Sequence, residues 1–371
     1  MMLATFAEVM ETIGYVLLAL LALVVMVVIH ELGHYLAAKI LKFKVVEFGI
    51  GFGPRIFKWT NPRNGEIFSI RPIPLGGFCQ FVGEDEVSDN PDAFDNQPAW
   101  KRLIVLFSGA FFNLVSAWVI ITFFFTFYGQ ILPTVGQLYP DADGTYEHVL
   151  QEGDAILRVD GKQVNVLMPE DASTLLSKAG DTAELVVLRD GKKVKLTVSK
   201  STFLSGTYDE NGNFVPATDD AGNVVTYRGF GFGSVIRTVK LNFFTSLGRS
   251  FSFMFFLVYK ILAILGMLIT GKIGLENAGG PITTIGVISE ASRGGAAMLS
   301  YVVCLISANL AVMNLLPLPA LDGSRMVFCL IEMIFRKPVN KKIEAAIHTV
   351  GFFAILGFAI FADVFRWIKL V

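Results

Sequence analysis

Two histidines and one glutamate stand together near the end of an apolar stretch, in the run His30-Glu31-Leu32-Gly33-His34. On a helix, side chains at positions i and i+4 project from one face, one turn apart, so both histidines can reach a single zinc ion. A glutamate directly after the first histidine is placed to take a proton from the attacking water. The run also occurs by chance in surface helices. Three ionisable side chains in an apolar span are costly unless they are paired or bind a metal, however, which favours a catalytic zinc site.

A catalytic zinc site normally has a third protein ligand and one open position. His148 falls in a polar stretch, and His348 falls in a later apolar stretch, where we expect a buried, hydrogen-bonded role. Asp322 is the better candidate, because an aspartate at the end of an otherwise uncharged span needs a partner. Alternatively, Asp322 caps a helix beside Gly323, a role that it can fill while also binding metal.

Apolar stretches define the elements that must position these residues. The chain has 371 residues, of which 53% are hydrophobic, more than a soluble domain of this size carries. Its net charge of −1 gives no indication of a nucleic-acid partner. Four segments reach the length of about 20 residues that crossing a bilayer requires. They run from about Ile13 to His34, from Leu103 to Tyr128, from Met298 to Leu318 and from Ala345 to Ala362.

Lysine and arginine cluster after the first span, before the second, and between the third and fourth, so we expect these loops in the cytosol. The N-terminus and the polar segment from about Leu132 to Lys240 then lie outside. His30 is about 17 residues into the first span, roughly 25 Å from the outer face, and Asp322 has a similar depth. A fifth apolar run, Phe251 to Thr270, would reverse this orientation if it crossed. We therefore expect it at the outer surface or packed on the bundle, although a span tolerates one interior lysine by snorkelling.

The loop after the first span predicts a β-hairpin. Ile56 to Trp59 and Ile67 to Ile70 have strand character and flank the turn Asn64-Gly65. Isolated hairpins are marginal in water, so we expect this one to dip into the bundle. One interpretation is a sheet edge that accepts an unwound substrate, and the other is a cytosolic plug that seals the site. In the first, the substrate-binding residues are Ile67, Phe68 and Ser69.

Two residues of the third span are further candidates for substrate binding. Asn314 and Pro317 precede Asp322 and are predicted to hold the substrate backbone. Alternatively, Pro317 and Pro319 break the third helix so that Asp322 can turn inward.

The polar segment from about Leu132 to Ile236 has the composition of a soluble domain. Leu150 to Gly161 is similar to the turn-and-strand core of bacterial PDZ domains, and Glu184 to Val198 predicts a hairpin with an Asp-Gly turn. Pro169 to Ala179 suits a helix, and Ser205 to Val225 suits an inserted hairpin or a mobile loop. Such a domain binds chain ends or strands, excludes bulky substrates, or acts as a rigid spacer.

A series of motifs follows in a fixed order along the chain: His30–His34, Phe48–Pro54, Pro74–Phe78, Gly83, Glu84, Gly109, Asn113, Gly280–Ile282 and Asn314–Gly323. Together they resemble the site-2 protease family of intramembrane zinc metalloproteases, specifically its bacterial RseP/RasP-like branch with one PDZ domain. The resemblance implies zinc bound by His30, His34 and Asp322, with Glu31 as catalytic base. It also implies a multi-pass protein of the bacterial inner or plasma membrane that cleaves single-span membrane proteins, such as anti-sigma factors or remnant signal peptides. One departure is Ala110, where the family usually has proline.

The sequence as a whole predicts a polytopic α-helical membrane protein with four transmembrane helices, a membrane-associated β-hairpin and an inserted α+β PDZ-like domain. A membrane-anchored PDZ scaffold with a structural zinc is a second interpretation, but a structural site needs no general base such as Glu31. A metal transporter would have ionisable residues at many depths, whereas here they cluster at one level. The predicted segments are residues 1–44 (first span), 45–100 (hairpin loop), 101–131 (second span), 132–240 (PDZ-like domain), 241–294 (surface helix and connector), 295–336 (third span) and 337–371 (fourth span).

Overall fold

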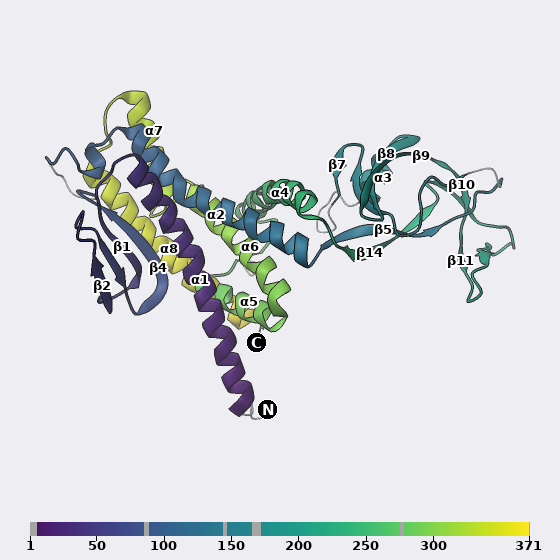
Figure 1. Ribbon diagram of the computed structural model, residues 1–371, viewed down its shortest axis with the longest axis horizontal. Coiled ribbons are helices and arrows are strands. Elements are labelled where there is room, and N and C mark those ends of the chain that lie inside the picture. Colours follow the sequence, from purple (N-terminus) through teal and green to yellow (C-terminus); the bar gives the residue numbers. More distant parts are fainter. Residues whose placement is uncertain (1–5, 85–88, 144–146, 165–171, 275–277, 371) are drawn as a thin grey trace. The chain divides into compact units, whose positions relative to one another are not determined.

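The chain folds into two compact units, which are described separately. A computed structural model describes residues 6–84, 89–143, 147–164, 172–274 and 278–370 (Figure 1). One unit is Thr122–Arg249, here called the inserted unit. The other, here called the helical unit, consists of the chain before and after it.

Five long apolar helices make this a polytopic helical membrane protein with additional β structure. In the described part of the chain, five helices are long and apolar enough to cross a membrane. Four of them contain most of each predicted span, and the fifth, α4, contains nearly all of the run Phe251 to Thr270. With 27 residues α4 also has the length to cross, so its predicted place at the outer surface rests on the charge distribution alone. The five are α1 (Phe6–Ile40), α2 (Ala99–Phe127), α4 (Phe243–Ile269), α6 (Gly295–Leu315) and α8 (Lys341–Leu370).

Shorter helices join these long ones in the helical unit. Helix α5 (Pro281–Arg293) precedes α6, and α7 (Asp322–Phe335) follows it. Helix α6 ends at Leu315, and Asp322 is the first residue of α7. The intervening loop contains Pro317 and Pro319, which confirms that the two prolines separate the helices.

A four-stranded sheet follows α1. Its strands are β1 (Val45–Phe52), β2 (Phe57–Thr60), β3 (Ile67–Ile70) and β4 (Ile73–Phe81), in the order β2-β3-β1-β4. The predicted hairpin is confirmed as the antiparallel pair β2 and β3. Strand β3 also pairs in parallel with β1, so the prediction that Ile67 to Ile70 offers a free edge is wrong. Among the described strands β4 pairs only with β1, and its other edge is open.

The inserted unit is built around a second sheet with strand order β14-β5-β6-β8-β9, in which β7 pairs with β6. The predicted hairpin with an Asp-Gly turn is formed by β8 and β9, with Asp190 and Gly191 both at positive φ. The segment from Ser205 to Val225 contains the antiparallel pair β11 and β12, as the predicted inserted hairpin, and the pair β10 and β13 flanks this segment. The predicted helix is α3, and its first predicted residues lie outside the described ones. The bounds are β5 (Gln130–Leu138), β6 (Ala155–Val159), β7 (Lys162–Gln163), α3 (Ala172–Lys178), β8 (Thr182–Arg189), β9 (Lys192–Ser199), β10 (Ser201–Leu204), β11 (Gly206–Tyr208), β12 (Phe214–Pro216), β13 (Thr226–Gly229) and β14 (Phe232–Val239).

Candidate metal centre

Three side chains converge where α1 meets the first residue of α7. His30 and His34 lie one turn apart on α1 and are buried. The Asp322 Oδ2 atom lies 3.0 Å from His30 Nε2 and 3.3 Å from His34 Nε2. The two Nε2 atoms are 3.2 Å apart. The three residues predicted as ligands are therefore together, with one ligand atom from each within 4.8 Å of the others.

The outer nitrogens of both imidazoles, the Nδ1 atoms that point away from Asp322, have partners that orient the rings. His34 Nδ1 lies 2.8 Å from the carbonyl oxygen of Val105, which can only accept, so Nδ1 carries the proton and Nε2 keeps its lone pair. His30 Nδ1 lies 3.3 Å from the side-chain amide of Asn113. Asn113 is fully buried, and its Oδ1 atom has no hydrogen-bond partner.

If the amide oxygen and nitrogen of Asn113 are exchanged, the buried oxygen gains a hydrogen-bond partner. Oδ1 would then accept a hydrogen bond from His30 Nδ1, and His30 would take the same tautomer as His34. Two imidazole nitrogens and one carboxylate oxygen, with the outer nitrogens bonded to oxygen, are the donor set of catalytic zinc sites. The residues present therefore fit zinc.

Two glycines allow α1 and α2 to approach closely at this point. A Cβ atom on Gly33 would lie 2.4 Å from the carbonyl oxygen of Ser108 on α2. A Cβ atom on Gly109 would lie 2.4 Å from His34 Nε2 itself. Sequence reasoning found Gly109 only through the family resemblance, and the contact now supplies its physical reason: any side chain there would displace a candidate ligand.

Glu31 and the open edge of β4 border the same cavity. The cavity has a volume of about 320 Å³ and includes the three candidate ligands, Glu31 and Asn314 in its lining. A Cβ atom on Gly77 would lie 3.0 Å from Glu31 Cγ, so the glutamate side chain lies against the strand. The lining does not include Pro317 or the β3 residues. Strand β4 contributes Gly76, Gly77, Phe78, Cys79 and Phe81 to it.

The three β3 residues predicted to bind substrate have other partners. Phe68 packs against the rings of Tyr35, Phe48 and Trp59, and Ile67 pairs with Glu47 and Thr60 across the strands. Ser69 is buried, and its hydroxyl donates to Glu47 Oε1 over 2.5 Å.

Glu47 is the centre of a buried polar network that sequence reasoning missed. It also accepts hydrogen bonds from Arg71, over 2.8 Å, and from Arg55. Burial opposes ionisation of Glu47, but the hydrogen bonds from Arg55, Ser69 and Arg71 outweigh it and lower its pKa to about 2. The available signal was one acidic residue within the otherwise apolar run Val45 to Phe52, with arginines nearby.

The other two histidines are not among the candidate ligands. His148 Nε2 is 2.8 Å from the carbonyl oxygen of Tyr139 in the inserted unit. His348 Nδ1 accepts a hydrogen bond of 3.1 Å from the backbone N–H of Ala320, which confirms the predicted hydrogen bond, although the side chain is half-buried and not buried as predicted.

Comparison with known proteins gives consistent matches over nearly the whole chain. The model of peptidase family M50 matches residues 18–358. A candidate zinc metalloprotease of Fusobacterium nucleatum is 32% identical over 356 residues, which cover 94% of this chain and 97% of the relative. Others from Clostridium perfringens and a Nostoc species are 30% and 31% identical, over 94% and 93% of this chain and 97% and 94% of their own. The family match extends through all three candidate ligands.

Proposed function

Because the chain belongs to peptidase family M50 and is a zinc metalloprotease, we propose that it hydrolyses peptide bonds within transmembrane segments of other membrane proteins. The main support for this proposal is the position of the candidate ligands relative to membrane-length helices. His30 and His34 lie on α1, Asp322 follows α6 after a short loop, and both helices are long enough to span a bilayer. A soluble metalloprotease has no need to build its metal centre from such helices.

In this proposal each residue at the centre has a distinct role. His30, His34 and Asp322 hold zinc, which when bound supplies a Lewis acid for the hydrolysis. Glu31 takes the proton of the attacking water and delivers it to the leaving amine. Asn314, which lines the cavity, is proposed to hold the substrate backbone, whereas Pro317 ends α6 and gives the loop its direction.

Substrate is proposed to bind as an added strand on β4 instead of β3. Peptide bonds in an intact helix are shielded by their own hydrogen bonds, so the substrate must unwind before cleavage. An extended segment can then pair with an open sheet edge. Three observations support this site. No described strand pairs with the outer edge of β4, the strand lies against Glu31, and five of its residues line the cavity.

The proposed topology is that of the RseP/RasP-like branch in a bacterial plasma membrane. The N-terminus and the PDZ-like inserted unit lie outside, where the unit screens substrates by size or binds their ends, and the four-stranded sheet and α7 lie toward the cytosol. Single cysteines at Asn211 and Asn64 test this, because both positions are exposed and the native cysteines are buried. An impermeant reagent applied to intact cells should label Asn211→Cys only. Labelling of Asn64→Cys alone would reverse the topology.

The decisive experiment maps the cut site in a single-span substrate co-expressed with wild type or with Glu31→Gln. We expect a cut near the cytosolic end of the substrate helix with wild type and none with the variant. Leu→Gly in the inner half of the substrate helix should speed cleavage, because glycine lowers the cost of unwinding by about 1 kcal/mol. The same change in the outer half is the matched control. A cut in a soluble exterior loop, insensitive to both changes, would refute intramembrane cleavage.

A further inference from the structure

Helix α8 contacts the loop that joins α6 to α7 at two neighbouring points. The backbone N–H of Ala320 donates to His348 Nδ1 over 3.1 Å. Three residues further along α8, a Cβ atom on Gly351 would lie only 1.9 Å from the Cβ atom of Pro319. Positions i and i+3 share a helix face, so one face of α8 supports two consecutive residues of the loop.

Ala320 lies at the turn that leads to Asp322. Its φ of 69° is in the left-handed region, which L-residues with a side chain adopt reluctantly. Leu321 N–H donates to the carbonyl oxygen of Leu318 over 3.2 Å, and the Ala320 N–H is satisfied by His348. A strained turn persists only where its surroundings hold it, and here the support comes from α8.

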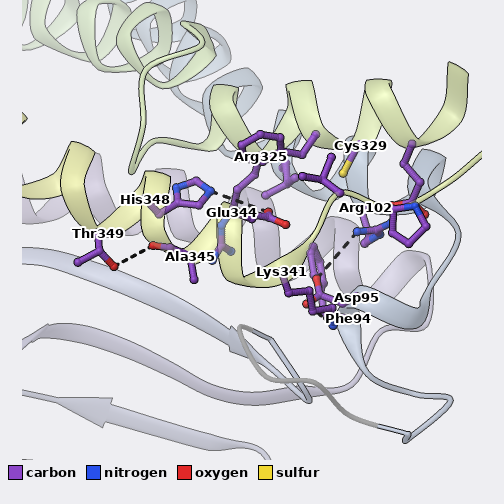
Figure 2. A pocket seen from close by; sticks show the side chains of 15 residues that line it. Phe94, Asp95, Arg102, Arg325, Cys329, Lys341, Glu344, Ala345, His348 and Thr349 are labelled. Carbon is purple, nitrogen blue, oxygen red and sulfur yellow. Dashed lines mark hydrogen bonds and ion pairs between the residues drawn. The ribbon is translucent and has the colours of Figure 1, made fainter. Parts of the chain in front are cut away.

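The His348 ring is itself fixed on two sides. The Phe328 ring of α7 packs edge-on against it, with ring centroids 5.8 Å apart. Glu344 Oε1, one turn earlier on α8, lies 3.9 Å from His348 Nε2, and Figure 2 marks this contact with a dashed line. Because Nδ1 accepts from Ala320, the ring proton belongs on Nε2, where the negative charge of Glu344 favours it.

We propose that His348 and Gly351 are positioning residues that hold the Ala320 turn so that the Asp322 carboxylate faces His30 and His34. This inference rests on the proposed role of Asp322 as a zinc ligand. Helix α8 contributes no residue to the cavity that holds all three candidate ligands, but its His348 lines a neighbouring cavity together with Ala320 and Asp322. The helix therefore acts on the metal centre through the loop.

Release of zinc from the purified full-length protein into an excess of chelator tests the role of His348. The side-chain oxygen of asparagine lies close to the position of Nδ1, whereas that of glutamine lies closer to Nε2. We expect His348→Ala and His348→Gln to release zinc about three- to tenfold faster than wild type, the factor that one lost hydrogen bond gives. His348→Asn should restore the wild-type rate. A glutamine variant like wild type, or an asparagine variant as fast as alanine, would overturn the role of Nδ1.

A second pair of variants keeps the test informative if the histidine variants fail to fold. Gly351→Ala should push α8 from Pro319 and speed zinc release, whereas Gly357→Ala on the same helix meets no atom within 4 Å and should not. Asp322→Ala distinguishes failure of the proposed ligand set from failure of the proposed support by α8. If it keeps zinc, the proposed ligand set fails. If it loses zinc while Gly351→Ala behaves like Gly357→Ala, the support by α8 is refuted.

Discussion

The inserted unit contains hairpin turns set by adjacent residues, whereas the metal centre of the helical unit is assembled from residues far apart in the chain. In the inserted unit the Asp160-Gly161 and Asp190-Gly191 turns join neighbouring strands, and all four residues have positive φ. In the helical unit, function depends on contacts between distant residues, such as His30 with Asp322, 292 positions apart. Local turn signals therefore identify single hairpins, whereas the sheet of the inserted unit, in which β14 pairs with β5, and the metal centre both also require contacts between distant segments.

The largest expected effect on zinc binding and activity comes from adding one methyl group where α2 meets α1 in the helical unit. Gly109→Ala would bring a Cβ atom to 2.4 Å from His34 Nε2 and 2.8 Å from His30 Cε1. We expect loss of bound zinc and of proteolysis, since overpacking of this kind costs about 1–3 kcal/mol and here displaces a ligand. Metal analysis of the purified protein measures it. Gly266→Ala on α4, where nothing lies within 4 Å, is the control, and equal zinc in both variants would contradict the account.

A buried ion pair of the inserted unit should affect folding but not zinc. Asp154 is 1% exposed and binds Arg189 through two hydrogen bonds, of 2.8 and 2.6 Å. Asp154→Ala leaves the arginine without this partner, and we expect a loss of about 3–5 kcal/mol in stability. Thermal unfolding in detergent measures the loss of stability, and metal analysis of the same sample shows whether zinc is retained. A variant of unchanged melting temperature, or one that loses zinc while folded, would remove the contrast between the units.

The Glu47 network should make the stability of the helical unit depend on pH. The carboxyl pKa falls from 4.5 to about 2 on folding, so its stabilisation is present above pH 4.5 and is lost as pH drops toward 2. Glu47→Gln should lower stability by on the order of 2 kcal/mol at neutral pH. The difference from wild type should shrink between pH 4.5 and 2. Unfolding measured across that range checks this, and a pH-independent difference would assign the effect to packing alone.

The smallest expected effect is at a local turn. Gly191 has a φ of 76°, and a Cβ atom there meets nothing within 4 Å. Gly191→Ala should therefore cost only about 1 kcal/mol, the penalty of the left-handed conformation for a residue with a side chain. Thermal unfolding measures it, with zinc unchanged. A cost as large as that of Asp154→Ala would mean that the turn has contacts beyond its own hairpin.

Much of the fold and the metal centre was predictable because the signals are local. Hydropathy gave the four predicted spans, each of which lies largely within a helix, and Asn64-Gly65 and Asp190-Gly191 gave two hairpins. The candidate ligands followed from charge within apolar segments.

The remaining features arise from pairing between distant segments. The parallel pairing of β1 with β3 places the strand expected at the edge inside the sheet, between β2 and β1, and it leaves β4 at the edge instead. The contacts of Asn113 with His30 and of His348 with Ala320 likewise join separate helices or loops. In one sequence such residues look like ordinary buried polar groups, because the partner that gives each its role is far along the chain.

The most direct test of the account is the zinc content of purified wild type beside His30→Ala, His34→Ala, Asp322→Ala and Glu31→Gln. Wild type and Glu31→Gln should contain about one zinc per chain, because the role proposed for Glu31 is to act on water and not to hold the metal. The three ligand variants should contain almost none. Undiminished zinc in Asp322→Ala would contradict the metal centre described for this chain.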